Sequence, residues 1–176
     1  PSEEEIETRL SRYYIKCTVD DFIIIDTIAD KMTVDYVYEL LEEVPEFVMN
    51  DYKNDAGKII LKRGLKEKDY PNAVGLYNPN FHSIKLDIQF INTTIYHELG
   101  HYFEDKYEAM TKVKITDDTR DFFSKENFYS EKDDELFAES FSYYILNNEE
   151  FKVQCPDTYQ DLDLLIKELK DQNITE

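Results

Sequence analysis

Two of the three histidines in this 176-residue chain stand one helical turn apart, with a glutamate beside the first. They are His97 and His101, in the run TTIYHELGHYFED, and Glu98 follows His97. Residues four apart share one face of an α-helix, so both imidazoles can turn a nitrogen toward one ion. Glu98 lies further round the helix, where it would contact a water on that ion. The spacing indicates half of a zinc site; the alternative is a helix that carries two structural imidazoles.

A third ligand has to come from another element. Catalytic zinc takes three protein ligands and leaves a fourth position for water. Glu104 and Glu108 lie on the histidine face, but further along the same straight helix, so they cannot surround the same ion. His82, the third histidine, precedes a predicted strand, and we interpret it as a loop residue.

The second candidate helix carries a carboxylate pair among aromatic residues. In DDELFAESFSYY, Glu135 and Glu139 are four residues apart and share a face. In the functional interpretation Glu135 binds the metal, and Glu139 accepts the other N–H of a ligand histidine and fixes its tautomer. The alternative is a solvated acidic stripe that continues from Asp133 and Asp134.

The elements that would position these residues form one α+β domain over residues 1–176. We expect a helix and a small sheet in about 1–90, and the helices with the site in about 91–176. Apolar spacing and breakers predict strands at 21–27, 58–63, 73–77 and 83–90, and helices at 1–17, 33–52 with an interruption at Pro45, 91–110, 130–148 and 155–172.

Several boundaries are specific. Ser2 and Glu5 form a capping-box pattern, and Ser130 followed by Asp133 predicts the N-cap of the glutamate helix. Alternation in SIKLDIQF predicts that Ile84, Leu86, Ile88 and Phe90 share one buried face. The stretch TKVKITDDTRDFFSKENFYS is mixed and polar.

The charge excludes some partners. The chain has 39 acidic and 20 basic residues, a net charge of −19. This argues against nucleic acid and anionic membranes, and favours a cationic partner by steering, although a well-solvated acidic surface explains it equally. No apolar run has membrane-spanning length. As for the oligomeric state, we expect a monomer.

The ends and the cysteines leave questions open. The chain begins at Pro1 without an initiator Met and shows no signal peptide. We therefore expect that a leader has been removed, either by the cell or in cloning. Cys17 and Cys155 match no metal-ligand spacing and are either one bridge or two thiols.

HELGH followed by ELFAESFSYYIL resembles the catalytic domain of anthrax lethal factor and, still more, the small secreted Pro-Pro endopeptidases. The closing stretch NNEEFKVQCPDTYQDLDLL is similar to their C-terminal helical end, so the resemblance covers roughly residues 91–170. It implies a zincin-like (gluzincin) fold with a small mixed sheet flanked by helices, and a bacterial, secreted zinc endopeptidase. It implies one zinc ion per chain, bound by His97, His101 and Glu135, with Glu98 as general base and Glu139 behind a ligand. It also implies a peptide or protein substrate that contains proline and is laid along residues 73–77 or 83–88. The acidic charge, rather than the resemblance, suggests that this substrate is basic, with Lys or Arg near the cleaved bond.

Two positions depart from that family. The tyrosine that stabilises the oxyanion stands seven residues before the ligand glutamate, where this chain has Phe128. We assign that role to the adjacent Tyr129, with a packed aromatic as the alternative. YPNAVGLYNPNF replaces the family's glycine-rich loop, so Pro-Pro specificity stays open.

Three other functions remain compatible with these residues. The chain could be a zinc-containing peptide-binding module with weak or no catalysis, or a structural or regulatory domain without metal. The same ligand set also suits hydrolysis of a non-peptide amide.

Overall fold

The computed structural model describes residues 22–26, 31–128 and 130–174. The chain divides into two compact units, Pro1–Ile95 and Tyr96–Glu176, with the boundary inside helix α4 (Ile91–Tyr107). The expectation of one domain over the whole chain stays a prediction.

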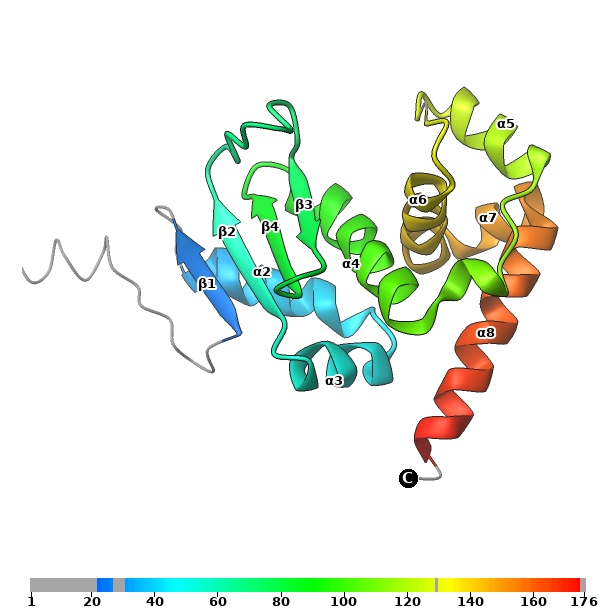
Figure 1. Cartoon of the computed structure of the whole chain (residues 1–176), viewed down its shortest axis with the longest axis horizontal. Helices are drawn as coiled ribbons and strands as arrows, with labels where there is room; N and C mark the ends of the chain where they lie inside the picture. The colour runs from blue at the N-terminus through cyan, green and yellow to red at the C-terminus, as the bar shows by residue number, and fades with distance from the viewer. Residues whose placement is uncertain (1–21, 27–30, 129, 175–176) are drawn as a thin grey trace, which may run out of the picture. The chain divides into compact units, whose positions relative to one another are not determined.

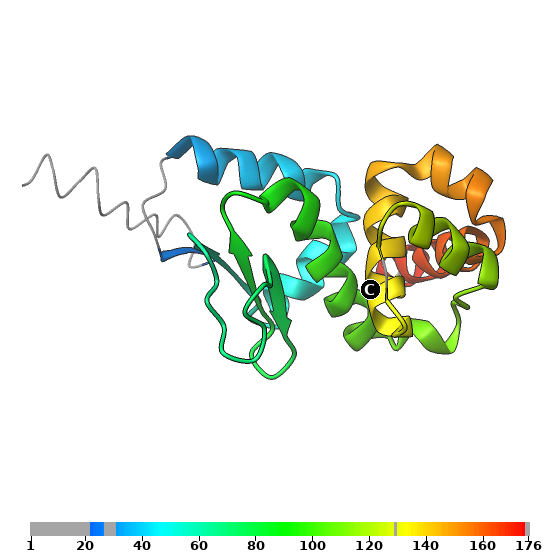
Figure 2. The same ribbon diagram turned by 90° about the horizontal axis from the view of Figure 1, so that it is seen from above.

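The N-terminal unit is built on a four-stranded mixed sheet with the order β1-β2-β4-β3. Its strands are β1 (Ile23–Asp26), β2 (Lys58–Lys62), β3 (Gly75–Asn78) and β4 (Ser83–Asp87). β1, β2 and β4 are parallel, and β3 pairs antiparallel with β4. Ile59 and Leu61 on β2, and Ile84 and Leu86 on β4, are fully buried. Helix α2 (Lys31–Glu42) runs along one face of the sheet (Figures 1 and 2). The α+β class and the small flanked sheet are therefore confirmed.

Pro45 separates α2 from α3 (Glu46–Asn54), as predicted. It occupies the N-cap of α3, where its missing N–H costs no helical hydrogen bond. The Tyr52 hydroxyl of α3 donates to the Lys58 carbonyl over 2.7 Å and ties this helix to the start of β2.

The predicted strand at 83–90 is too long. β4 ends at Asp87, because this residue starts a turn: its side chain accepts from the Gln89 amide at 3.1 Å and its carbonyl from the Phe90 amide at 2.9 Å. Ile88 is therefore only half-buried, and Phe90 is 44% exposed. The predicted burial holds for Ile84 and Leu86 and is wrong for Ile88 and Phe90.

The C-terminal unit contains most of the helices (Figure 1). They are the remainder of α4, the 3-10 turn η1 (Ala109–Thr111), α5 (Asp117–Lys125), α6 (Asp133–Leu146), α7 (Asn148–Gln154) and α8 (Pro156–Ile174). Their core is aromatic: Phe103 of α4 lies 5.0 Å from Phe141 of α6 between ring centroids, and Phe123 of α5 stacks with Phe151 of α7. All four rings are fully buried.

Helix α5 lies in the stretch predicted only as mixed and polar. It begins because the Thr116 side chain accepts from the Thr119 amide, and Phe122 and Phe123 supply its buried face. The predicted N-cap Ser130 is wrong: Lys132 holds that position, and the Ser130 hydroxyl accepts from the Lys132 amide instead.

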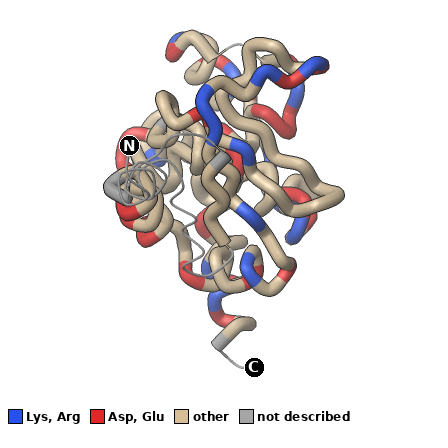
Figure 3. Tube along the Cα trace, turned by 90° about the vertical axis from the view of Figure 1, so that its left-hand side faces the viewer, with Lys and Arg blue, Asp and Glu red and all other residues tan. Residues whose placement is uncertain are grey.

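Every described α-helix carries acidic residues. In Figure 3, Asp and Glu are likewise scattered along the trace rather than gathered in one place. Such a distribution matches a solvated surface and does not by itself identify a partner. In the described part of the chain, no helix is both long and apolar enough to cross a membrane. Cys155 is a buried free thiol, whereas Cys17, Ser2 and Glu5 lie outside the described residues.

Candidate metal centre

Helix α4 presents one buried face and one partly open face. Ile95, Leu99, Tyr102 and Phe103 have no exposed surface. His97 and His101 keep 13% and 19% of their side chains exposed. The apolar face fixes the rotation of the helix, so that both imidazoles share the opposite side, as the spacing predicts.

His97, His101 and Glu135 lie together. One ligand atom from each residue can be chosen so that all three fall within 4.8 Å of one another, the only such group of His, Cys, Asp or Glu among the described residues. Glu135 Oε2 is 3.2 Å from His97 Nε2, and Glu135 Oε1 is 3.7 Å from His101 Nε2. Two imidazoles and one carboxylate form a donor set that suits catalytic zinc. The side chains therefore fit the ion that the sequence implies.

Glu139 contacts the same histidine from its other side. Its Oε2 lies 2.9 Å from His97 Nδ1. A carboxylate only accepts, so Nδ1 carries the proton and Nε2 is the nitrogen available to a metal. This is the contact that the sequence analysis predicts between Glu139 and a candidate ligand histidine; its orienting role stays a prediction.

Contacts at this site shift the pKa values of the two histidines and of Glu135. Burial lowers the pKa of His97, but hydrogen bonds to Glu135 and Glu139 outweigh it and raise the pKa to about 10. The His97 hydrogen bond also lowers the pKa of Glu135, while burial and the charge on His97 lower the pKa of His101. A proton and a metal ion would therefore compete for His97 Nε2.

The histidine pair of α4 and the glutamate pair of α6 come together because the two helices cross closely. A Cβ on Gly100 would lie 2.8 Å from Ala138 Cα and 2.9 Å from Ala138 O. Gly100 stands between the two histidines of α4, and Ala138 between the two glutamates of α6. Sequence reasoning missed this contact, although glycine in a helix interior costs up to ~1 kcal/mol relative to alanine and so signals a packing reason.

Glu98 is 6% exposed and makes an electrostatic contribution that raises the pKa of its neighbour His97. A buried carboxylate next to the candidate ligands is compatible with a general base, and that role stays a prediction.

An aromatic ring packs against the candidate centre. The Phe128 ring centroid lies 5.9 Å from that of His97, and its amide donates to the Phe123 carbonyl over 2.9 Å. Phe128 therefore occupies the vicinity of the imidazole and offers no hydroxyl. Tyr129, to which we assigned the oxyanion role, lies outside the described residues.

The remaining histidine belongs to the sheet. His82 is in the turn between β3 and β4, with a φ of 46°, and its Nδ1 is 3.1 Å from the Tyr77 hydroxyl. It is a loop residue, as predicted.

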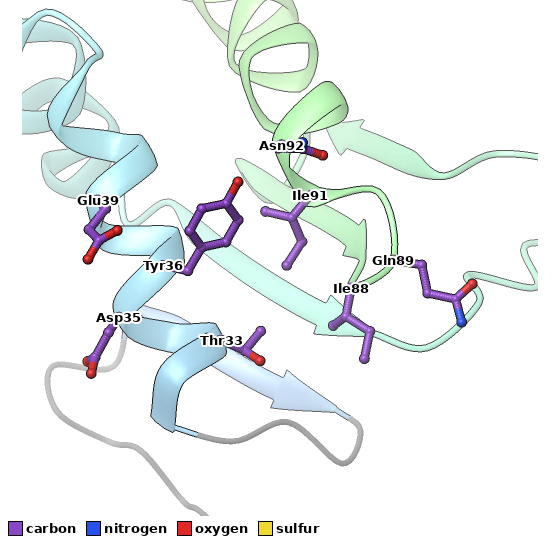
Figure 4. Close-up of a pocket in the computed structure, with 8 residues that line it drawn as sticks. All are labelled: Thr33, Asp35, Tyr36, Glu39, Ile88, Gln89, Ile91 and Asn92. Carbon is purple, nitrogen blue, oxygen red and sulfur yellow. The ribbon is translucent and has the colours of Figure 1, made fainter.

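The N-terminal unit also has an open hollow of about 750 Å³ between α2 and the turn before α4 (Figure 4). Tyr36 and Thr33 face Ile88 and Ile91 across it, whereas Asp35 and Glu39 project from the other side of α2 (Figure 4). None of His97, His101 and Glu135 lines this hollow.

Comparisons with known proteins bear on the fold. No family model matches the sequence, and no curated protein matches it. Among solved structures, the chain is similar to the Pro-Pro endopeptidase PPEP-2 from Paenibacillus alvei, with a TM-score of 0.59. The match covers 84% of this chain and 98% of that chain, at 16% sequence identity. At this identity the likeness shows the fold: a Pro-Pro-endopeptidase-like arrangement of sheet and helices.

Proposed function

We propose that this chain is a zinc-dependent endopeptidase. The observation that carries the proposal is the convergence of His97, His101 and Glu135 within 4.8 Å, from two helices. The fold similarity to a Pro-Pro endopeptidase supports the same reaction class.

His97, His101 and Glu135 would hold the zinc ion, and Glu139 would hold His97 in the required tautomer. When bound, zinc supplies Lewis acidity: it lowers the pKa of a water and polarises a carbonyl.

Glu98 acts as the general base in this proposal. As the water oxygen attacks the peptide carbonyl carbon, the Glu98 carboxylate takes one of its protons. It then gives that proton to the amide nitrogen, and the C–N bond breaks to release a carboxylic acid and an amine. Tyr129 is our candidate donor to the oxyanion.

The substrate would be an extended peptide with basic residues. Of the two segments that the sequence suggests, the one at 73–77 overlaps β3, which lies at a sheet edge, whereas β4 is paired on both sides. A peptide strand can add only at an edge, so we favour β3. A bacterial secreted location and a monomeric state remain part of this proposal.

Peptide-library cleavage tests the function. Purified chain with one zinc ion per molecule should cut a subset of peptides, and chelation should stop this. Glu98→Gln should retain the zinc and lose roughly 10²–10⁴-fold in kcat. Normal turnover by Glu98→Gln would overturn the base assignment, and cleavage that survives zinc removal would overturn the metallopeptidase.

One observation favours a second candidate, a zinc-containing peptide-binding module with weak or no catalysis. Phe128, which has no hydroxyl, packs beside His97. Full zinc occupancy with peptide binding, but without cleavage of any library member, would support this second function.

A further inference from the structure

We propose that Phe128 is a positioning residue that shields the hydrogen bond between His97 and Glu139 from water. The inference rests on the proposed zinc function, which it deepens by assigning a role to a residue on neither metal-site helix. Phe128 contacts no substrate in this proposal and acts only through His97.

The first step is the contact itself. The Phe128 ring lies 5.9 Å from the His97 ring between centroids, at an interplanar angle of 58°. His101 approaches the same imidazole edge-on at 4.9 Å and 81°. The His97 ring is therefore contacted by an apolar ring and by its fellow candidate ligand, and only 13% of its side chain stays exposed.

The second step is that Phe128 is held in place. Its amide donates to the Phe123 carbonyl over 2.9 Å, and its ring meets the Phe123 ring edge-on at 6.2 Å. Phe123 is fully buried and also packs against Phe151 and Tyr143. Thus a residue just past the end of α5 is anchored to the aromatic core, although it belongs to a connecting segment.

The third step is electrostatic. The bond from His97 Nδ1 to Glu139 Oε2 is 2.9 Å long, and Glu139 keeps 20% of its side chain exposed. Such a bond orients a ligand more strongly where the local dielectric constant is low, and an apolar shell around a metal site controls the access of solvent. The Phe128 ring is the apolar group that covers the His97 imidazole on this side.

Two measurements on the full chain test the proposal. The first is the solvent exchange of the His97 Nδ1–H proton by NMR in the metal-free protein. This proton should exchange at least about tenfold faster in Phe128→Ala than in wild type. The second is the zinc Kd by chelator competition, which should rise about tenfold, at the low end of the 10–100-fold expected for groups that support a ligand.

The matched control is Phe122→Ala. Phe122 contacts Phe123 and Tyr143, and no ring contact joins it to His97 within the described residues. This variant removes the same atoms from the same cluster, so it should lower the thermal stability but leave the exchange rate and the zinc Kd near wild type. Phe128→Tyr keeps the covering ring, so both the exchange rate and the zinc Kd should stay near their wild-type values. If Phe128→Ala does not fold, Phe128→Leu, which lacks the ring, takes its place.

The results separate the two proposals. Unchanged exchange and an unchanged Kd in Phe128→Ala, or equal effects in Phe122→Ala, would overturn the role of Phe128. Absence of zinc binding by the wild type would overturn the proposed function, while the exchange of the His97 proton would still test the shielding.

Discussion

At the scale of single residues, the centre is organised around His97. Each of its two ring nitrogens is contacted by a different carboxylate. Glu135 lies at Nε2 and Glu139 at Nδ1. These two contacts have different consequences. In the proposed function, a metal would replace the Glu135 contact, whereas the Glu139 contact would persist and orient the ring.

Removal of the persistent contact should weaken metal binding. In Glu139→Ala, the His97 ring loses its orienting partner, so we expect the zinc Kd to rise about 10–100-fold. Glu139→Gln keeps an oxygen acceptor, so its zinc Kd should rise less than that of Glu139→Ala. The zinc Kd by chelator competition gives the comparison, with exposed Glu149→Ala on α7 as the control. Equal affinity in all four proteins would contradict the role of Glu139.

At the scale of elements, the site depends on how closely α4 and α6 cross. Gly100 permits backbone contact with Ala138, and each lies between the two candidate metal-site residues of its own helix. The ligands can therefore converge without long side chains reaching across a gap.

Gly100→Ala should separate these helices. On an open helix this change would stabilise by up to ~1 kcal/mol. Here the new Cβ would overlap the Ala138 backbone, so we expect a loss of about 1–3 kcal/mol in the free energy of unfolding. The urea concentration at the midpoint of unfolding and the affinity for zinc should both fall. Adding Ala138→Gly should not rescue the variant, because the clash is with backbone atoms; a stabilised Gly100→Ala protein would refute the close crossing.

The contact between α6 and α8 should depend on pH. The Tyr144 hydroxyl donates to Asp163 Oδ1 over 2.9 Å. Burial raises the pKa of Asp163, but hydrogen bonds from Lys167 and Tyr144 outweigh it and lower the pKa below its ordinary value. A carboxyl group whose pKa is lowered by folding adds to the free energy of unfolding. This stabilisation is fully present above the pKa of the unfolded state, 3.8, and is lost as the pH falls through the lower pKa of the folded state.

Tyr144→Phe should therefore cost about 1 kcal/mol in the free energy of unfolding near pH 7. The difference from wild type should shrink below about pH 4, as Asp163 becomes protonated. Urea titrations of both proteins at several pH values measure this. A difference that grows toward acid would have the wrong sign for the proposed contact.

The elements also show what sequence patterns could predict. Local sequence signals were sufficient to predict β1, β2, α2, α3, α4 and α6. These signals are Pro45, the β-branched runs and the i, i+4 pairs. β4 was predicted too long, because Asp87 starts a turn that alternation does not reveal. Helix α5 was missed, because only Phe122 and Phe123 mark its apolar face and its cap is a single Thr116 contact. The crossing at Gly100 and the approach of Phe128 to His97 depend on tertiary packing, which spacing along one helix does not encode.

At the scale of the whole molecule, the net charge of −19 bears on substrate choice. Acidic residues are spread over the described helices, so their combined field would attract cationic peptides over distances longer than direct contact.

If the substrate is basic, its cleavage should depend on salt. The kcat/KM for a lysine-containing peptide should fall as ionic strength rises, because exposed charges are screened beyond about 10 Å at 0.1 M salt. A neutral variant of the same peptide is the control and should change little. Equal salt responses of the two peptides would contradict steering by charge.

Diffraction at the zinc absorption edge, from crystals grown with zinc, tests the central claim most directly. We predict one strong anomalous peak per chain, bonded to His97 Nε2, His101 and Glu135, with Glu139 still on His97 Nδ1. A chain without a peak there, or with Glu135 outside the coordination sphere, would contradict the account.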